Sequence, residues 1–262
     1  MSTALINGAR IAYDDTGGDG PPIVLAHGFL MDRSMFDPQV EALAADHRVI
    51  TWDERGFGDT EYDGEPFTYW DSASDCLGLL DHLGIKRAVI GGMSQGGFVS
   101  LRVALMAPER VRALILLDTQ AGTEDPEVAP LYEGMIDDWV TNGPTDDLTA
   151  ATASIILGHP ELDAEWSERW MIRPQATLRQ PGTTLLTRDS IWDRLGEITA
   201  PALVVHGTAD TAISMDKAER LDAGLVGSNG VVRIDGGTHA ANLTHPAEVN
   251  AALVAFLADL PA

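Results

Sequence analysis

The chain has 262 residues, enough for one large α/β domain, and its 45% hydrophobic and 22% charged content is that of an ordinary globular protein. Its formal charge of −23, from 40 acidic and 17 basic residues, argues against nucleic acid and anionic membranes and favours a neutral or cationic small molecule as ligand. The chain contains no 18-residue apolar stretch and no signal-peptide pattern, and its one cysteine, Cys76, cannot form an internal disulfide. These features predict a cytoplasmic protein without a membrane segment.

Short apolar, β-branched runs alternate with helical patterns, which predicts a mostly parallel sheet with helices on both faces. The chain opens with an expected antiparallel hairpin that turns at Asn7-Gly8. The expected strands are Ala4–Asn7, Arg10–Asp14, Ile23–Ala26, Val49–Trp52, Ala88–Ile90, Ala113–Leu117, Ala202–His206 and Val231–Ile234. The expected helices are Met35–Ala44, Tyr69–Leu83, Gln95–Met106 and Pro246–Leu260, with Thr244 as a candidate cap for the last.

Residues 122–190 break this alternation, because they contain helical patterns and no strand pattern. One apolar stripe comprises Leu131, Met135, Ile136, Trp139 and Val140, and a second comprises Trp166, Trp170 and Met171. We therefore expect a core of residues 1–121 and 191–262, with residues 122–190 inserted as a helical cap over the carboxyl edge of the sheet.

The segment Gly92-Met93-Ser94-Gln95-Gly96 lies between an expected strand and an expected helix. A serine with glycines two positions to either side is the pattern of a nucleophile elbow, in which a sharp turn exposes the serine Oγ. Side chains at the two glycine positions would collide with neighbouring backbone. The pattern predicts Ser94 as the nucleophile.

A serine hydroxyl needs a base, and the base needs a carboxylate that orients it. His239 follows the last expected strand and is the predicted base. Asp210 follows the next-to-last strand and is the predicted acid, while Asp118, at the end of the sixth strand, is its rival. His206 is expected to be structural, and His245 to begin the closing helix near His239; His47, His82 and His159 fall in surface-like positions.

The segment His27-Gly28-Phe29-Leu30 follows the third expected strand, where an oxyanion hole belongs. The backbone N–H groups of Phe29 and Gln95 are its predicted donors. The following Asp53-Glu54-Arg55-Gly56-Phe57-Gly58 is interpreted as loop architecture, with Asp53 and Arg55 in structural hydrogen bonds.

With these motifs in this order, the chain resembles the α/β-hydrolase superfamily over its whole length. The runs Gly92–Phe98 and Ala107–Leu114 are similar to 3-oxoadipate enol-lactonases and small bacterial carboxylesterases. Epoxide hydrolases and haloalkane dehalogenases carry aspartate, and dienelactone hydrolases cysteine, where this chain has Ser94. Cofactor-free haloperoxidases and perhydrolases usually carry proline at the position of Leu30, and carbon–carbon bond hydrolases have a different oxyanion loop.

The resemblance and the motifs predict a serine hydrolase that cleaves a small carboxylic ester or lactone through an acyl-enzyme, without a metal or organic cofactor. Alternatives are a perhydrolase or haloperoxidase, a carbon–carbon bond hydrolase, and a non-catalytic small-molecule receptor. A carboxylated lactone substrate would need a cation, for which Arg169, Arg173 and Arg179 are candidates, although ion pairs with neighbouring acids are the simpler use of all three. The expected apolar pocket residues are Leu30, Met135, Trp139, Trp166 and Trp170.

Overall fold

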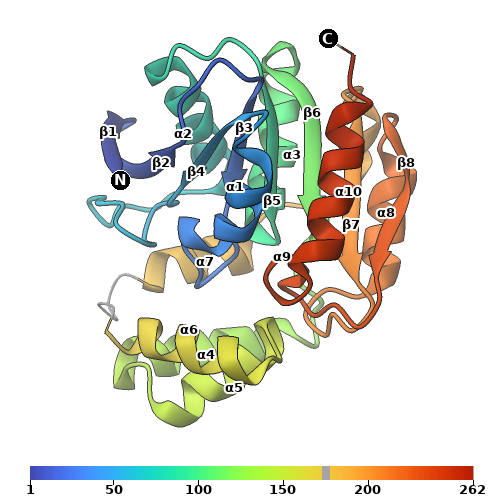
Figure 1. Ribbon diagram of the computed structural model, residues 1–262. Helices are drawn as coiled ribbons and strands as arrows, with labels where there is room; N and C mark the ends of the chain where they lie inside the picture. Colours follow the sequence, from blue (N-terminus) through green and yellow to red (C-terminus); the bar gives the residue numbers. More distant parts are fainter. Residues whose placement is uncertain (173–177, 262) are drawn as a thin grey trace.

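A computed structural model describes residues 1–172 and 178–261 and contains one eight-stranded sheet with helices on both faces (Figure 1). The strand order is β1-β2-β4-β3-β5-β6-β7-β8. The β1 and β2 strands form an antiparallel hairpin, and β2 runs antiparallel to β4, whereas the pairs from β4 to β8 are parallel. The predicted α/β-hydrolase fold is confirmed.

The strands are β1 Ser2–Ile6, β2 Ala9–Asp15, β3 Pro22–Ala26, β4 Arg48–Trp52, β5 Ala88–Met93, β6 Val111–Leu117, β7 Ala202–Gly207 and β8 Ser228–Ile234. The central strands β3, β5, β6 and β7 are almost wholly buried, which explains their continuous apolar runs. Because parallel strands share one carboxyl edge, the loops that follow β3, β5, β7 and β8 converge at one end of the sheet.

Helices α2 Tyr69–His82, α3 Gln95–Met106 and α8 Met215–Gly224 pack on one face of the sheet, and α1 Asp37–Leu43 and α10 Pro246–Ala258 pack on the other. Successive strand residues alternate between the two cores. In β3, for example, Val24 belongs to the core under α2 and α3, whereas Ile23 and Leu25 belong to the core under α1 and α10.

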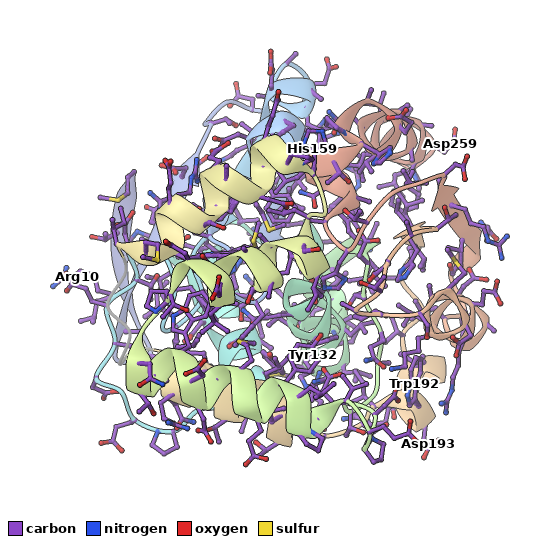
Figure 2. All side chains as sticks on the ribbon, turned by 90° about the horizontal axis from the view of Figure 1, so that it is seen from below. Arg10, Tyr132, His159, Trp192, Asp193 and Asp259 are labelled. Atoms are coloured by element: carbon purple, nitrogen blue, oxygen red, sulfur yellow. The ribbon has the colours of Figure 1, made fainter. Side chains whose placement is uncertain are left out.

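The insertion between β6 and β7 contains α4 Ala129–Asn142, α5 Asp146–Ile156, α6 Pro160–Met171 and α7 Arg179–Thr187. Helices α4, α5 and α6 form a layer at the carboxyl end of the sheet, seen edge-on in Figure 1 and from below in Figure 2. Tyr132 of α4 and His159, which precedes α6, are labelled there. The short α9 helix, Ala241–Thr244, precedes α10.

Some boundaries differ from the sequence-based expectation. The expected helix from Met35 is divided, because Asp32 caps a short 3-10 helix at Arg33–Phe36 before α1 begins. The expected cap residue of α10, Thr244, instead ends α9, and His245 occupies the N-cap position without a side-chain cap bond. Among the described residues, no helix is long and apolar enough to cross a membrane.

Candidate active site

Ser94 lies at the turn between β5 and α3 with φ 51° and ψ −110°. A residue other than glycine rarely adopts this region, so the backbone is strained there. A Cβ at Gly92 would overlap Gly96, and a Cβ at Gly96 would overlap the carbonyl of Ala26. The two glycines therefore let the turn pack against β3, and Ser94 lies at the carboxyl end of the sheet.

Three side chains from three separate loops form a continuous hydrogen-bonded chain. The Oγ of Ser94 lies 3.0 Å from Nε2 of His239, and Nδ1 of His239 lies 2.8 Å from Oδ2 of Asp210. Asp210 is fixed in turn, because its Oδ1 accepts hydrogen bonds from the backbone N–H groups of Ala212 at 2.8 Å and Ile213 at 2.9 Å. This is the arrangement that a serine nucleophile, a base and an orienting acid require.

The electrostatics of the pair match these positions. Burial alone would lower the pKa of His239, but the charge and hydrogen bond of Asp210 outweigh it and raise the pKa above its usual value. Burial would raise the pKa of Asp210, but His239 and the backbone N–H of Ile213 hold it below the usual range. Asp210 is therefore a carboxylate at neutral pH, facing an imidazole that accepts a proton readily.

Asp118, the rival acid, lies behind the loops that carry Asp210 and His239. Its two carboxyl oxygens accept hydrogen bonds from the backbone N–H groups of Gly207 at 2.8 Å and Ala241 at 3.2 Å. Burial, together with the nearby charge of Asp210, raises its pKa well above the usual value. Asp118 thus supports the two loops, while Asp210 contacts the imidazole.

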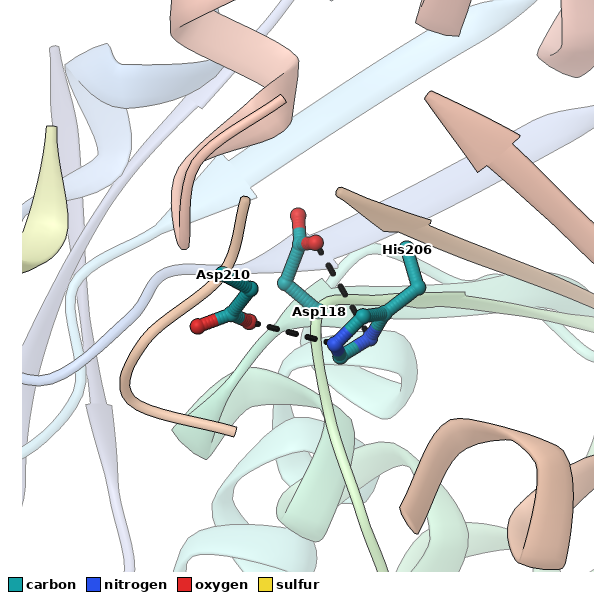
Figure 3. A group of neighbouring side chains, drawn as sticks. All are labelled: Asp118, His206 and Asp210. Carbon is teal, nitrogen blue, oxygen red and sulfur yellow. Dashed lines mark ion pairs between the residues drawn. The ribbon is translucent and has the colours of Figure 1, made fainter. Parts of the chain in front are cut away.

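Asp118, His206 and Asp210 form a buried group that resembles a metal-ligand set (Figure 3). Nε2 of His206 lies 2.8 Å from the carbonyl oxygen of Ile213, so this nitrogen carries a proton and donates it. It therefore has no lone pair for a metal, although it is the nitrogen nearest to Asp210, at 3.3 Å. Nδ1 is 3.9 Å from Asp118. Nδ1 keeps its lone pair, but the carboxyl oxygens of Asp118 and Asp210 already accept hydrogen bonds from Gly207, Ala241, Ala212, Ile213 and His239. We therefore interpret the group as structural.

Phe29 lines the same pocket as Ser94, and Gln95 follows Ser94 directly at the start of α3; each has a backbone N–H that the sequence predicts as an oxyanion donor. Within residues 1–172 and 178–261, neither N–H donates to a protein acceptor, so both are available to an oxygen bound there. Leu30, which follows Phe29, has φ 66°, and its carbonyl accepts a hydrogen bond of 2.8 Å from the indole N–H of Trp170 on α6. The helical insertion thereby holds the loop that carries Phe29.

A pocket of about 420 Å³ opens at Ser94 and His239, between the sheet and the helical insertion. Its wall is mostly apolar, with Glu124 and Tyr132 as its more polar members. Burial, with the charges of Glu124 and Asp210, raises the pKa of Tyr132 to about 12, so its hydroxyl is protonated. The other lining residues are Phe29, Leu30, Met93, Phe98, Val128, Leu131, Met135, Thr152, Ile155, Ile156, Leu185, Thr211, Ala212 and Ile213.

Two of the expected pocket residues, Leu30 and Met135, line this pocket, but Trp139, Trp166 and Trp170 do not. The three indoles pack against one another inside the insertion, with ring centroids 5.9 Å apart for Trp139 and Trp170 and 6.4 Å for Trp166 and Trp170. The expectation that the three tryptophans line the pocket is therefore corrected. They form the interior of the insertion, and the large aromatic surface that they bury there stabilises it.

The arginines considered for a substrate carboxylate lie elsewhere. Arg169 pairs with Glu165 at 2.6 Å and contacts Ser34, and Arg179 pairs with Asp137. Neither lines the pocket, and Arg173 lies outside the described residues. A cation that no sequence pattern indicates, Arg188, contacts Glu124 of the pocket wall.

Arg188 is buried at the base of the insertion and connects its two ends. Its Nε donates to the carbonyl of Gly122 at 2.8 Å, and its Nη1 lies 2.7 Å from the carboxylate of Glu124. Its guanidinium also lies 4.4 Å from the ring centre of Phe98 on α3. Because these partners are far apart in the sequence, no local pattern identifies Arg188 or Glu124 as neighbours of the site.

The fold and this site define a member of the α/β-hydrolase class, and comparison with known proteins agrees. Residues 21–246 match the family described as alpha/beta hydrolase fold, so the chain belongs to that family. It is similar to a solved esterase from Thermogutta terrifontis with malate bound (27% identity, TM-score 0.89, 98% of each chain). It is equally similar to the enol-lactonase from Burkholderia xenovorans LB400 (27% identity, TM-score 0.89, 98% of this chain and 100% of that one).

A curated relative from Synechocystis is 29% identical over 265 residues, or 94% of each chain, and carries the provisional name of a non-heme chloroperoxidase. The predicted resemblance to enol-lactonases and esterases is confirmed, and the protein is a hydrolase-family member with relatives of more than one activity.

Proposed function

We propose that this protein is a serine hydrolase that cleaves a small carboxylic ester or lactone through an acyl-enzyme. The hydrogen-bonded chain from Ser94 through His239 to Asp210 carries the proposal, because it combines nucleophile, base and acid at the mouth of a pocket. The two N–H donors of Phe29 and Gln95 support it, since acyl transfer requires stabilisation of an oxyanion.

In this mechanism Ser94 Oγ attacks the carbonyl carbon while His239 Nε2 takes the hydroxyl proton. The carbonyl electrons move to oxygen, and the N–H groups of Phe29 and Gln95 donate to that oxyanion. Collapse of the intermediate expels the alcohol, which receives the proton from His239. A water then attacks the acyl-enzyme by the same route, and Ser94 is released with the carboxylate product.

The pocket supports a substrate with an apolar acyl or alcohol group. Its lining is aliphatic and aromatic near Ser94, and at its rim Leu131 and Ile155 are 72% and 45% exposed. The carboxylate of Glu124 stands in the wall and disfavours a substrate carboxylate nearby. We propose that residues 122–190 act as the cap that closes this pocket.

A second candidate is a perhydrolase, since one relative is named as a chloroperoxidase. The conformation of Leu30 favours the hydrolase. Proline, which such enzymes usually carry at this position, fixes φ near −65° and cannot adopt the φ of 66° found at Leu30. Halide-dependent oxidation of a dye in the presence of acetate and hydrogen peroxide, at a rate above that of ester hydrolysis, would favour the perhydrolase instead.

The test is Ser94→Ala in an assay with short p-nitrophenyl esters and a lactone panel. Turnover should fall to background while the thermal transition stays close to that of the wild type, because the hydroxyl contributes little to packing. A fluorophosphonate probe should label the wild type and a Ser100→Ala control, whose altered serine lies on α3, the helix that follows Ser94, but it should not label Ser94→Ala. Labelling or turnover retained in Ser94→Ala would refute the proposal.

A further inference from the structure

Glu54 is a buried carboxyl that the proposed mechanism does not use. It follows β4 and is 1% exposed, and its side chain faces Ser72 of α2 and Gln95 of α3. In the described part of the chain no arginine or lysine pairs with it. Burial of a carboxyl without such a partner costs free energy, which suggests that Glu54 has a role that offsets the cost.

The backbone of Glu54 is tied to the oxyanion loop. Its N–H donates to Nε2 of His27 at 3.0 Å, so the imidazole is neutral there and carries its proton on Nδ1. That Nδ1 lies 2.7 Å from the carbonyl of Gly28 and donates to it. The chain of contacts from Glu54 thus ends one residue before Phe29, the first proposed oxyanion donor.

The side chain of Glu54 faces the second donor. The amide oxygen of Gln95 accepts a hydrogen bond of 3.2 Å from the hydroxyl of Tyr69, which turns the amide nitrogen away from Tyr69. The carboxyl oxygens of Glu54, Oγ of Ser72 and Nε2 of Gln95 are all buried and face one another, but none of these atoms forms a hydrogen bond of normal geometry within the described residues. The side chain of Gln95 therefore lies between the hydroxyl of Tyr69 and the carboxyl of Glu54.

We propose that Glu54 is a positioning residue that joins the two halves of the oxyanion hole, and that it does so as a neutral carboxyl. Its backbone positions the Phe29 side through His27, and its side chain positions the Gln95 side. The inference rests on the proposed function and adds a residue that acts through Phe29 and Gln95 without contacting substrate.

The surroundings favour the neutral form. Burial raises the pKa of Glu54 to about 8, although Gln95 and Ser72 act to lower it. The charged or titratable groups that face it are Asp75, Cys76 and Tyr69 of α2, and His27 after β3. Asp75 adds repulsion, and Arg55 is engaged by Asp75 at 2.5 Å.

Above the pKa of Glu54, an unpaired charge forms beside Gln95 and the donors lose their alignment. Because the donors of the oxyanion hole stabilise the transition state more than the bound substrate, kcat should fall while KM stays nearly constant. The wild type should lose about tenfold in kcat for each pH unit above this limb. Glu54→Gln, which keeps the shape and cannot ionise, should abolish the alkaline limb.

The experiment measures kcat and KM from pH 6 to 10 for the wild type, Glu54→Gln and Glu61→Gln, a control that makes the same exchange at an exposed position. Ser72→Ala is a second variant, which should move the limb to higher pH because a donor to the carboxylate is lost. Alkaline limbs that coincide in the wild type, Glu54→Gln and Ser72→Ala, or a loss that appears in KM, would overturn the inference.

An infrared difference titration gives a readout that needs no turnover. In the difference spectrum of the wild type minus Glu54→Gln, the carbonyl band of a protonated carboxyl should be present at neutral pH and disappear at high pH. The buried carboxyl of Asp118, whose pKa is also raised, is common to both proteins and cancels in this difference. If the band is present and no ester is cleaved, the proposed hydrolase function fails while the neutral carboxyl stands. If esters are cleaved and the band is missing, the positioning inference fails alone.

Discussion

At the scale of single residues, strain gathers where the strands end. Four non-glycine residues have positive φ: Asn7 in the first hairpin turn, Leu30, Ser94 and Asp118, among residues 1–172 and 178–261. The last three follow β3, β5 and β6, and each lies at or beside the candidate site. Such conformations persist only where surrounding structure fixes them, and they concentrate at functional sites.

Asp210→Asn should lower kcat by roughly 10⁴, because the amide cannot stabilise the imidazolium and favours the wrong tautomer. It should also move the acid limb of kcat/KM to lower pH. The base must be neutral, so activity rises as pH passes upward through the pKa of His239, which Asp210 raises above 6.5. The pH profile of both constants tests this.

Asp118→Asn is the matched comparison. The carboxyl oxygens of Asp118 accept hydrogen bonds from Gly207 and Ala241, and the change replaces one of these oxygens by an amide donor. The free energy of unfolding should therefore fall by about 1–3 kcal/mol, while kcat stays nearly unchanged. Thermal unfolding and the same rate assay separate the two effects. A large loss of kcat in Asp118→Asn with a mild one in Asp210→Asn would assign the acid to β6.

Sequence reasoning reached these residues unevenly, for physical reasons. Ser94 and its glycines form a local motif, because one turn sets all their contacts. Asp210 and His239 were predicted from their position after strands, since the carboxyl ends of parallel strands converge. Glu124 and Arg188 were missed, because their contact joins the two ends of the insertion and has no spacing that a local pattern could reveal.

At the scale of elements, α6 reaches from the insertion to the oxyanion loop. Trp170 donates its indole N–H to the carbonyl of Leu30, and the rest of its ring packs among aromatic neighbours. The apolar stripe that contains Trp170 predicted a helix in this region, but an apolar stripe alone cannot distinguish a pocket wall from a helix interior. The packing of the insertion decides this, because Trp170 of α6 contacts Trp139 of α4.

Trp170→Phe keeps an aromatic ring and removes the donor, so the buried carbonyl of Leu30 loses its partner. We expect stability to fall by about 1–3 kcal/mol, and kcat to fall more than KM changes, because Phe29 is less firmly held. Chemical denaturation and steady-state kinetics measure the two effects.

Trp166→Phe is the control on the same helix. Its ring packs beside Trp170 and lies under Arg169, with the guanidinium 4.6 Å from the ring centre. The change should cost some packing and leave kcat close to the wild-type value. Equal losses of kcat in the two variants would show that Trp170 acts through general packing and not through Leu30.

At the scale of the whole molecule, the charge of −23 and the pocket act in the same direction. The field around the chain repels anions over a Debye length of about 10 Å at 0.1 M salt, and Glu124 adds a local carboxylate in the pocket wall. Arg188 neutralises part of that local charge, but it is buried beneath the wall and faces Glu124.

Neutral esters or lactones with apolar groups should therefore have higher kcat/KM than matched substrates that carry a carboxylate. Added salt should raise kcat/KM for the charged substrate, because repulsion is screened, and should leave the neutral one nearly unchanged. Glu124→Gln should improve the charged substrate specifically, whereas Glu127→Gln, which removes the same charge from an exposed position nearby, should not. Rates for both substrates at low and high ionic strength, in all three proteins, separate the effect of Glu124 from that of the net charge of the chain.

A carboxylated substrate that is preferred, and whose kcat/KM falls with added salt, would show instead that a cation binds the carboxylate. The role of Ser94 would be unaffected.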